Sequence, residues 1–124
     1  MSPSTAPRPG HPVRGSDSGR PIMAAFDLLG RRWTLRIVGD LGEGALGFNE
    51  LHRAIGSVST SVLATRLREL RAAAIVTTDD DGRYLLTELG RSLLVALAPL
   101  WVWSDHWARA NGSAPNDPPP GYGG

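Results

Sequence analysis

The distribution of proline constrains this chain more than any other feature of its sequence. Nine of the ten prolines lie in residues 1–21 or 112–124, and only Pro99 lies between these segments. Proline lacks a backbone N–H and interrupts helices and sheets, so regular structure is confined to the middle of the chain. The two ends also carry few large apolar side chains to offset the entropy lost on ordering. We predict disordered tails, residues 1–20 and 112–124, around one folded domain, residues 21–111.

The composition excludes several kinds of chemistry. All 13 basic residues are arginine, 12 acidic residues nearly balance them, and the chain contains no cysteine. Disulfides, thiolate nucleophiles and cysteine-bound zinc are therefore excluded. The longest apolar run, residues 93–103, is about half the length of a membrane span. No phosphate-binding glycine loop, HExxH motif or nucleophile elbow is present. We expect a cytoplasmic protein that is not an enzyme and needs neither a metal ion nor another cofactor.

Helical spacing of apolar residues marks the first half of the folded segment. It predicts helices over residues 22–30, 33–41 and 48–55. We expect Asn49 to cap the third helix, because its side chain can accept a hydrogen bond from a free backbone N–H. Gly56 is expected to end that helix.

The next predicted helix, residues 59–73, is the most informative. A narrow stripe of leucines predicts its buried face, and the opposite face carries hydroxyl side chains followed by arginines. Either Ser57 or Ser59 could cap this helix. Residues 52–72 hold four arginines against one glutamate, so the local charge is positive although the net charge of the whole chain is only +1.

The sequence then changes to strand character. β-Branched residues at 75–78, a turn-forming Asp-Gly pair and apolar residues at 84–86 predict a β-hairpin. Thr87 can cap a last helix that ends near Ala110, and we expect Pro99 to kink it.

The order of these elements predicts a mainly α-helical fold with a small β-hairpin wing, the winged helix-turn-helix. Residues 48–55 and 59–73 would form the helix-turn-helix pair, and residues 75–86 would form the wing.

Four motifs in this order are similar to those of one bacterial family. They are Gly30-Arg31-Arg32-Trp33-Thr34-Leu35, Phe48-Asn49-Glu50-Leu51, Leu67-Arg68-Glu69-Leu70 and Tyr84-Leu85-Leu86-Thr87-Glu88-Leu89-Gly90-Arg91. Together they resemble the HxlR-type winged helix regulators over roughly residues 20–107. The resemblance implies a homodimeric, sequence-specific DNA-binding repressor or activator. It also implies that the first and last helices form the dimer and that the second helix of the helix-turn-helix enters the major groove.

Two positions depart from the pattern of that family. Many members carry a cysteine just before the proline that opens the first helix, and some use it to sense electrophiles or oxidants. Arg20 stands at this position here, so sensing by a thiol is excluded. The predicted wing is short, and Asp79, Asp80 and Asp81 precede Arg83. These carboxylates would repel DNA phosphates, although Arg83 could still reach the DNA backbone.

The polar side chains around the second helix of the pair have two interpretations. They could form a solvated helix face, or they could contact DNA through hydroxyls, helix N-terminal amides and arginines. The order of the elements and the resemblance favour DNA. The predicted DNA-binding residues are Ser59, Thr60, Ser61, Thr65, Arg66, Arg68, Arg71 and Arg83.

The last helix has no polar face over residues 93–103, so part of it is expected to contact another subunit. It would form a dimer interface with the first helix, or its tryptophans could also line a pocket there for a flat aromatic effector. The residues assigned to this interface or pocket are Ile22, Met23, Phe26, Leu97, Leu100, Trp101, Trp103 and Trp107.

The leading hypothesis is a dimeric regulator that binds a roughly palindromic operator in double-stranded DNA. The alternative is a winged-helix module that binds another protein and not DNA, because this fold also serves that purpose. The acidic wing and the small net charge keep the alternative open.

Overall fold

The computed structural model describes residues 20–116. Of the predicted tails, 1–20 and 112–124, it includes only Arg20 and residues 112–116, and the remainder lies outside the described range. The secondary structure within it follows the predicted order. The elements are α1 (Pro21–Leu29), α2 (Thr34–Asp40), the 3₁₀ helix η1 (Leu41–Glu43), α3 (Phe48–Ile55), α4 (Thr60–Ala72), β1 (Val76–Thr78), β2 (Tyr84–Leu86) and α5 (Glu88–Ala110). The mainly helical fold with a small hairpin is confirmed.

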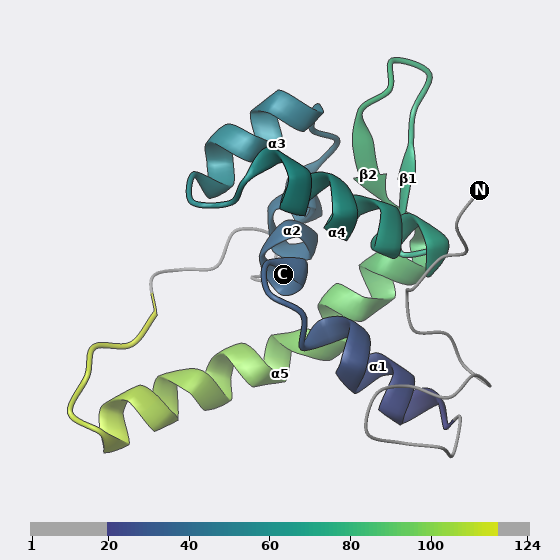
Figure 1. Cartoon of the computed structure of the whole chain (residues 1–124). Helices are drawn as coiled ribbons and strands as arrows, with labels where there is room; N and C mark the ends of the chain where they lie inside the picture. Colours follow the sequence, from purple (N-terminus) through teal and green to yellow (C-terminus); the bar gives the residue numbers. More distant parts are fainter. Residues whose placement is uncertain (1–19, 117–124) are drawn as a thin grey trace.

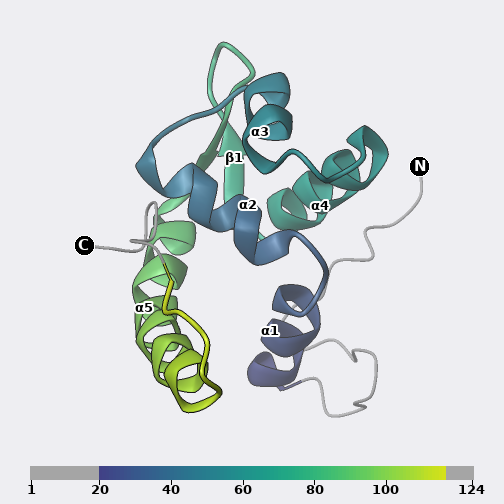
Figure 2. The same ribbon diagram turned by 90° about the vertical axis from the view of Figure 1, so that its left-hand side faces the viewer.

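The two ends of the molecule carry different elements. Figures 1 and 2 both place α3, α4 and the hairpin at one end, and α1 with the C-terminal half of α5 at the other. Helix α2 lies between them, and α5 runs from the base of the hairpin toward the α1 end. The helix-turn-helix therefore lies apart from the helices predicted to form a dimer.

The core lies where α2, α3 and α4 meet. Ile37, Leu51, Leu63, Leu67 and Leu70 are each at most 1% exposed. Burial of each such side chain stabilises the fold by roughly 1.5–3 kcal/mol. Three of these residues belong to the leucine stripe of α4, so the predicted orientation of this helix is confirmed.

Side-chain caps begin α4 and α5. Ser59, and not Ser57, caps α4, because its Oγ accepts a hydrogen bond from the backbone N–H of Val62 at 3.2 Å. Thr87 caps α5 as predicted, with its Oγ1 accepting from the backbone N–H of Gly90 at 3.0 Å.

The predicted cap of α3 is wrong. Gly47 is the N-cap residue, and Asn49 lies inside the helix. The carboxylate of Glu50 reaches back and accepts a hydrogen bond from the backbone N–H of Gly47 at 2.9 Å. A glutamate three residues into a helix commonly fills this role. The donor satisfied here is the N–H of the cap residue itself, whereas a cap at Asn49 would have accepted from an N–H further along the helix.

The hairpin is antiparallel, with Val76 opposite Leu86 and Thr78 opposite Tyr84. Tyr84 also pairs with Leu46, through two backbone hydrogen bonds of 2.8 and 2.9 Å. The link between η1 and α3 is thereby tied to the edge of the wing, which the sequence pattern did not predict.

Helix α5 is continuous on both sides of Pro99. No helix among residues 20–116 is both long and apolar enough to cross a membrane.

Candidate nucleic-acid interface

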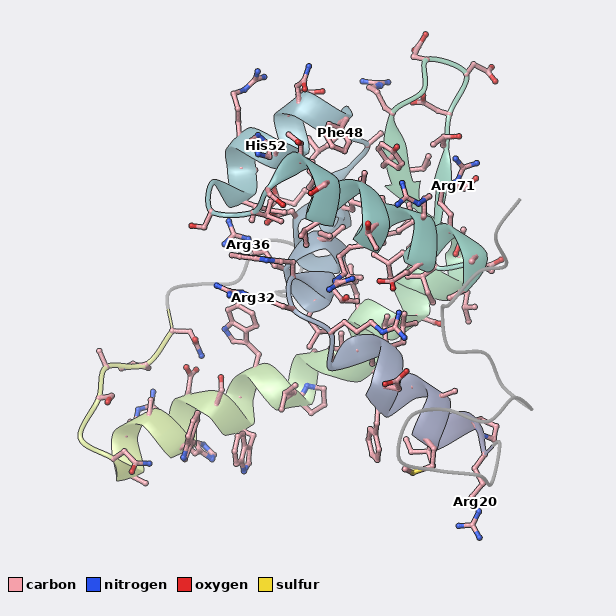
Figure 3. All side chains as sticks on the ribbon, viewed as in Figure 1. Arg20, Arg32, Arg36, Phe48, His52 and Arg71 are labelled. Carbon is pink, nitrogen blue, oxygen red and sulfur yellow. The ribbon has the colours of Figure 1, made fainter. Side chains whose placement is uncertain are left out.

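Hydrogen bonds hold the turn between α3 and α4. His52 Nε2 donates to the carbonyl oxygen of Val58 at 2.9 Å, and Arg36 Nη2 donates to that of Ala54 at 2.9 Å. Gly56 ends α3 with a φ of 83°, a left-handed conformation that glycine adopts without strain. Figure 3 shows His52 and Arg36 on the same side of the molecule as this turn. These contacts fix how α4 follows α3.

The N-terminus of α4 presents hydroxyl groups to solvent. Ser59, Thr60 and Ser61 are all exposed, and the Oγ atoms of Ser59 and Ser61 are 3.3 Å apart. A helix N-terminus also carries backbone N–H groups without intrahelical partners and a partial positive charge. A phosphate or a polar base edge can bind to such a surface.

Arginines continue the same surface toward the C-terminus of α4. Arg68 Nη2 donates to Thr65 Oγ1 at 3.1 Å, and that hydroxyl donates to the carbonyl of Ser61 at 3.0 Å. Arg68 and Arg71 are exposed, and neither forms an ion pair with any residue of the described range. Figure 3 shows Arg71 near the hairpin, at the far end of α4 from His52. Their charges are therefore available to an anionic partner.

Arg53 on α3 adds a third cation that was not among the predicted contact residues. It is exposed and forms no ion pair within residues 20–116. The predicted DNA contacts lay on the second helix of the pair and in the wing, so Arg53 on the first helix was not among them. Only the local excess of arginine over residues 52–72 pointed to its role.

Arg66 differs from its neighbours. Its Nη1 donates to Glu69 Oε1 at 3.0 Å, and its Nε donates to the backbone carbonyl of Arg32 at 2.8 Å. The side chain is only 20% exposed. Its hydrogen-bonding groups are thus engaged inside the chain, away from the surface formed by Arg68 and Arg71.

Arg83 in the wing is also paired. Its Nε donates to Asp79 Oδ2 at 3.2 Å, and its Nη2 lies 4.0 Å from Asp81 Oδ2. Asp79 Oδ1 accepts from the backbone N–H groups of Asp81 and Arg83, both at 2.9 Å. The wing tip therefore neutralises much of its own positive charge.

These contacts lower the pKa of the Asp79 carboxyl below its ordinary value. The largest cause is the hydrogen bond from the backbone N–H of Arg83, followed among the favourable contacts by the backbone N–H of Asp81 and the charge of the Arg83 guanidinium. Partial desolvation acts in the opposite direction.

The predicted interface residues separate into two groups. Ile22, Phe26, Leu100, Trp103 and Trp107 are each at least 50% exposed. The remaining three, Met23, Leu97 and Trp101, are half-buried. The indole rings of the two exposed tryptophans stack, with centroids 5.6 Å apart and planes 16° apart.

No three His, Cys, Asp or Glu side chains gather within residues 20–116 in a way that could hold a metal ion. The exposed hydroxyl-and-arginine surface on the second helix of the pair, with a hairpin beside it, defines a winged helix-turn-helix regulator of DNA-binding type. Residues 28–112 match the family model described as HxlR-like helix-turn-helix. The chain belongs to this family of transcriptional regulators, and it is not an enzyme.

Individual relatives agree with this assignment. The HTH-type transcriptional regulator YodB of Bacillus subtilis (strain 168) is 34% identical over 90 residues, which are 68% of this chain and 80% of YodB. The uncharacterized HTH-type transcriptional regulator YvaP of the same strain is 33% identical over 89 residues, 67% of this chain and 82% of YvaP. The crystal structure of quinone-bound YodB matches with a TM-score of 0.65 and 35% identity, over 68% of this chain and 94% of that one.

Proposed function

We propose that the chain is a dimeric, sequence-specific transcriptional regulator that places the N-terminal half of α4 in the major groove of a roughly palindromic operator. The observation that carries this proposal is the surface of α4. Hydroxyls cover its first turn, and Arg68 and Arg71 follow, exposed and without an acidic partner in the described part of the chain. Because its partner is chromosomal DNA, the proposed location is the cytoplasm.

The proposed contact residues would bind different groups of the DNA. Hydroxyls and N-terminal amides of α4 would hold phosphates, and the arginines would bind guanine or phosphate. Arg53 of α3 joins them as a phosphate contact, while Arg66 is assigned to the fold because its guanidinium is engaged inside the chain. Arg83 is proposed as a minor DNA contact, because its guanidinium would have to leave the carboxylate of Asp79 before it could bind a phosphate. The proposed contacts on α4 are Ser59, Thr60, Ser61, Thr65, Arg68 and Arg71.

Two experiments test DNA binding. A gel shift asks whether the purified protein binds the region upstream of its own gene, and selection from a random duplex library asks which sequence it prefers. Enrichment of an inverted repeat supports the proposal. A folded protein that shifts no DNA and enriches no sequence contradicts it and favours the protein-interaction module.

A second copy of the chain is the proposed partner of the apolar surface on α1 and α5. Ile22, Phe26, Leu100, Trp103 and Trp107 leave at least half of their surface in water, and several large exposed apolar side chains on two helices at one end of the molecule favour a protein interface there. A two-fold dimer through this end would direct both α4 helices toward DNA, where half-sites lie about 34 Å apart. The family membership supports the same arrangement.

Sedimentation equilibrium tests the dimer. The wild-type chain is expected to be a dimer, and Phe26→Glu is expected to be a monomer because a charge would be buried in the interface. Val95→Glu is the matched control, since Val95 is 75% exposed but lies on a different side of α5 from Leu100. A monomeric wild type, or equal effects of both variants, contradicts the assignment.

The stacked indoles of Trp103 and Trp107 are the proposed contact for a flat aromatic effector. Without cysteine, such a ligand would bind non-covalently. The YodB structure is described as quinone-bound, and this supports a flat, conjugated ligand. Tryptophan fluorescence of the wild type and of Trp103→Phe, titrated with a panel of planar compounds, tests this. A saturable change that the variant loses supports a site, and no change across the panel contradicts it.

A further inference from the structure

A chain of charged side chains joins α1 to α4. Glu69 of α4 is only 7% exposed although it carries a carboxylate. Its Oε2 accepts a hydrogen bond from Nη1 of Arg31, which lies in the link between α1 and α2. Arg31 also donates through Nη2 to Asp27 Oδ2 on α1, at 3.1 Å. The carboxylate of Glu69 is thus connected to that of Asp27 through one guanidinium.

A second contact ties α4 to the same link. Arg66 donates to Glu69 Oε1 through Nη1 and to the backbone carbonyl of Arg32 through Nε, at 3.0 and 2.8 Å. Figure 2 shows α1 and α4 on the same side of the molecule, with the link to α2 between them. Residues 38 positions apart in sequence, Arg31 and Glu69, are therefore joined where the proposed dimer end meets the proposed DNA end.

Stability alone does not explain a partly buried charge cluster around the buried carboxylate of Glu69. Taking charges out of water is costly, and apolar side chains of similar volume often serve stability equally well. Charge-assisted hydrogen bonds donated by a guanidinium are directional, however, because its donors lie in one plane. The cluster therefore restricts the orientation of α4 relative to α1 more strongly than an apolar contact between these two helices would.

We propose that Asp27, Arg31 and Glu69 are positioning residues that set the angle of α4 relative to the dimer helix α1. This inference rests on the proposed function. In a two-fold dimer, the separation of the two α4 helices depends on how each is held relative to the interface, and that separation must match the operator half-sites. Without the ion pairs, α4 can pivot on its leucine stripe, so the dimer accepts operators with other spacings.

Asp27→Asn and Glu69→Gln test this in the full-length protein. The probes are duplexes carrying two inverted copies of the half-site that the wild type selects, with the spacer varied by single base pairs over one helical turn. Glu43→Gln is the matched control, because Glu43 is an exposed carboxylate in η1 that forms no ion pair within residues 20–116. The measured quantity is the spacing preference, which is the dissociation constant for each other spacing divided by that for the best spacing.

Asp27→Asn and Glu69→Gln are each expected to lower this ratio by about fivefold or more, a coupling of ordinary allosteric size. Affinity for a single half-site and the dimer dissociation constant are expected to stay unchanged. The double variant should lower the ratio no further than Glu69→Gln alone, because both act through one network. Glu43→Gln should behave like the wild type.

A preserved spacing preference in Asp27→Asn overturns the inference, even if Glu69→Gln fails to fold, because Asp27 is linked to α4 only through Arg31 in the contacts above. An equal loss of affinity for a single half-site overturns it as well, since that result indicates general unfolding of α4. A wild type that selects no sequence contradicts the proposed function and this inference together. A wild type that selects an operator, with variants that keep its spacing, contradicts this inference alone.

Discussion

Gly90 lies directly against the backbone carbonyl of Ile75. A β-carbon built on Gly90 would overlap that oxygen and would also crowd the side chain of Leu86. Beside this contact, Thr87 Oγ1 donates to the carbonyl of Ala74 at 2.6 Å. The first turn of α5 is therefore packed on the base of the hairpin without space between them, and the wing and the proposed dimer helix are coupled in position.

Gly90→Ala is expected to destabilise the protein. The clash is with backbone, which cannot rotate away, so we expect a cost of about 1–3 kcal/mol. This exceeds the gain of up to about 1 kcal/mol that alanine brings as a better helix former. Thermal unfolding followed by circular dichroism should show a Tm several degrees lower. Ser92→Ala, an exposed position in the same helix turn, should leave the Tm nearly unchanged. An unchanged Tm in Gly90→Ala would mean that α5 can move away from the hairpin.

Ser59→Ala is expected to lower the free energy of unfolding by about 1 kcal/mol, because α4 loses the oxygen that accepts from Val62. Ser57→Ala is the matched control, since Ser57 is exposed and does not cap the helix. Urea unfolding of both variants measures the difference. Equal midpoints for the two variants would contradict the role of Ser59 as the cap.

The wing turn should lose stability in acid. The pKa of Asp79 is lowered in the folded protein, so its ionised form is favoured by folding. The resulting stabilisation is fully present above the ordinary carboxyl pKa of about 4 and is lost as the pH falls through the lowered value. The amide resonance of Arg83, followed by NMR during an acid titration, reports this protonation. Asp79→Asn should abolish the transition, and Asp80→Asn should keep it. A midpoint at the ordinary carboxyl value would contradict the assignment.

Local signals explain most of what the sequence predicted. The leucine stripe, the cap Thr87 and the Asp-Gly turn each depend on residues within a few positions of one another, and all three lie where the pattern placed them. The error at Asn49 is also local, because the cap lies two residues earlier than predicted: Gly47 is the N-cap residue, and Glu50 accepts from its N–H.

The remaining features depend on contacts that are distant in sequence. Arg66 and Arg68 are the same type of residue, so the sequence alone does not distinguish their roles. Two positions along a helix differ in direction by about 200°, so Arg66 is directed toward the carbonyl of Arg32 and Arg68 remains exposed. The pairing of Leu46 with Tyr84 likewise needs the folded chain to bring the two segments together. No periodicity within one element contains this information.

The salt dependence of DNA binding by Arg71→Ala tests the central claim most directly. Fluorescence anisotropy with the selected operator gives the association constant as salt is varied. Arg71→Ala should bind more weakly and should reduce the slope of log K against log salt by about one unit, the expected loss for one phosphate contact. Arg109→Ala, which removes an exposed charge at the far end of α5, should keep the wild-type affinity and slope. Identical affinities and slopes for Arg71→Ala, Arg109→Ala and the wild type would contradict DNA binding through α4.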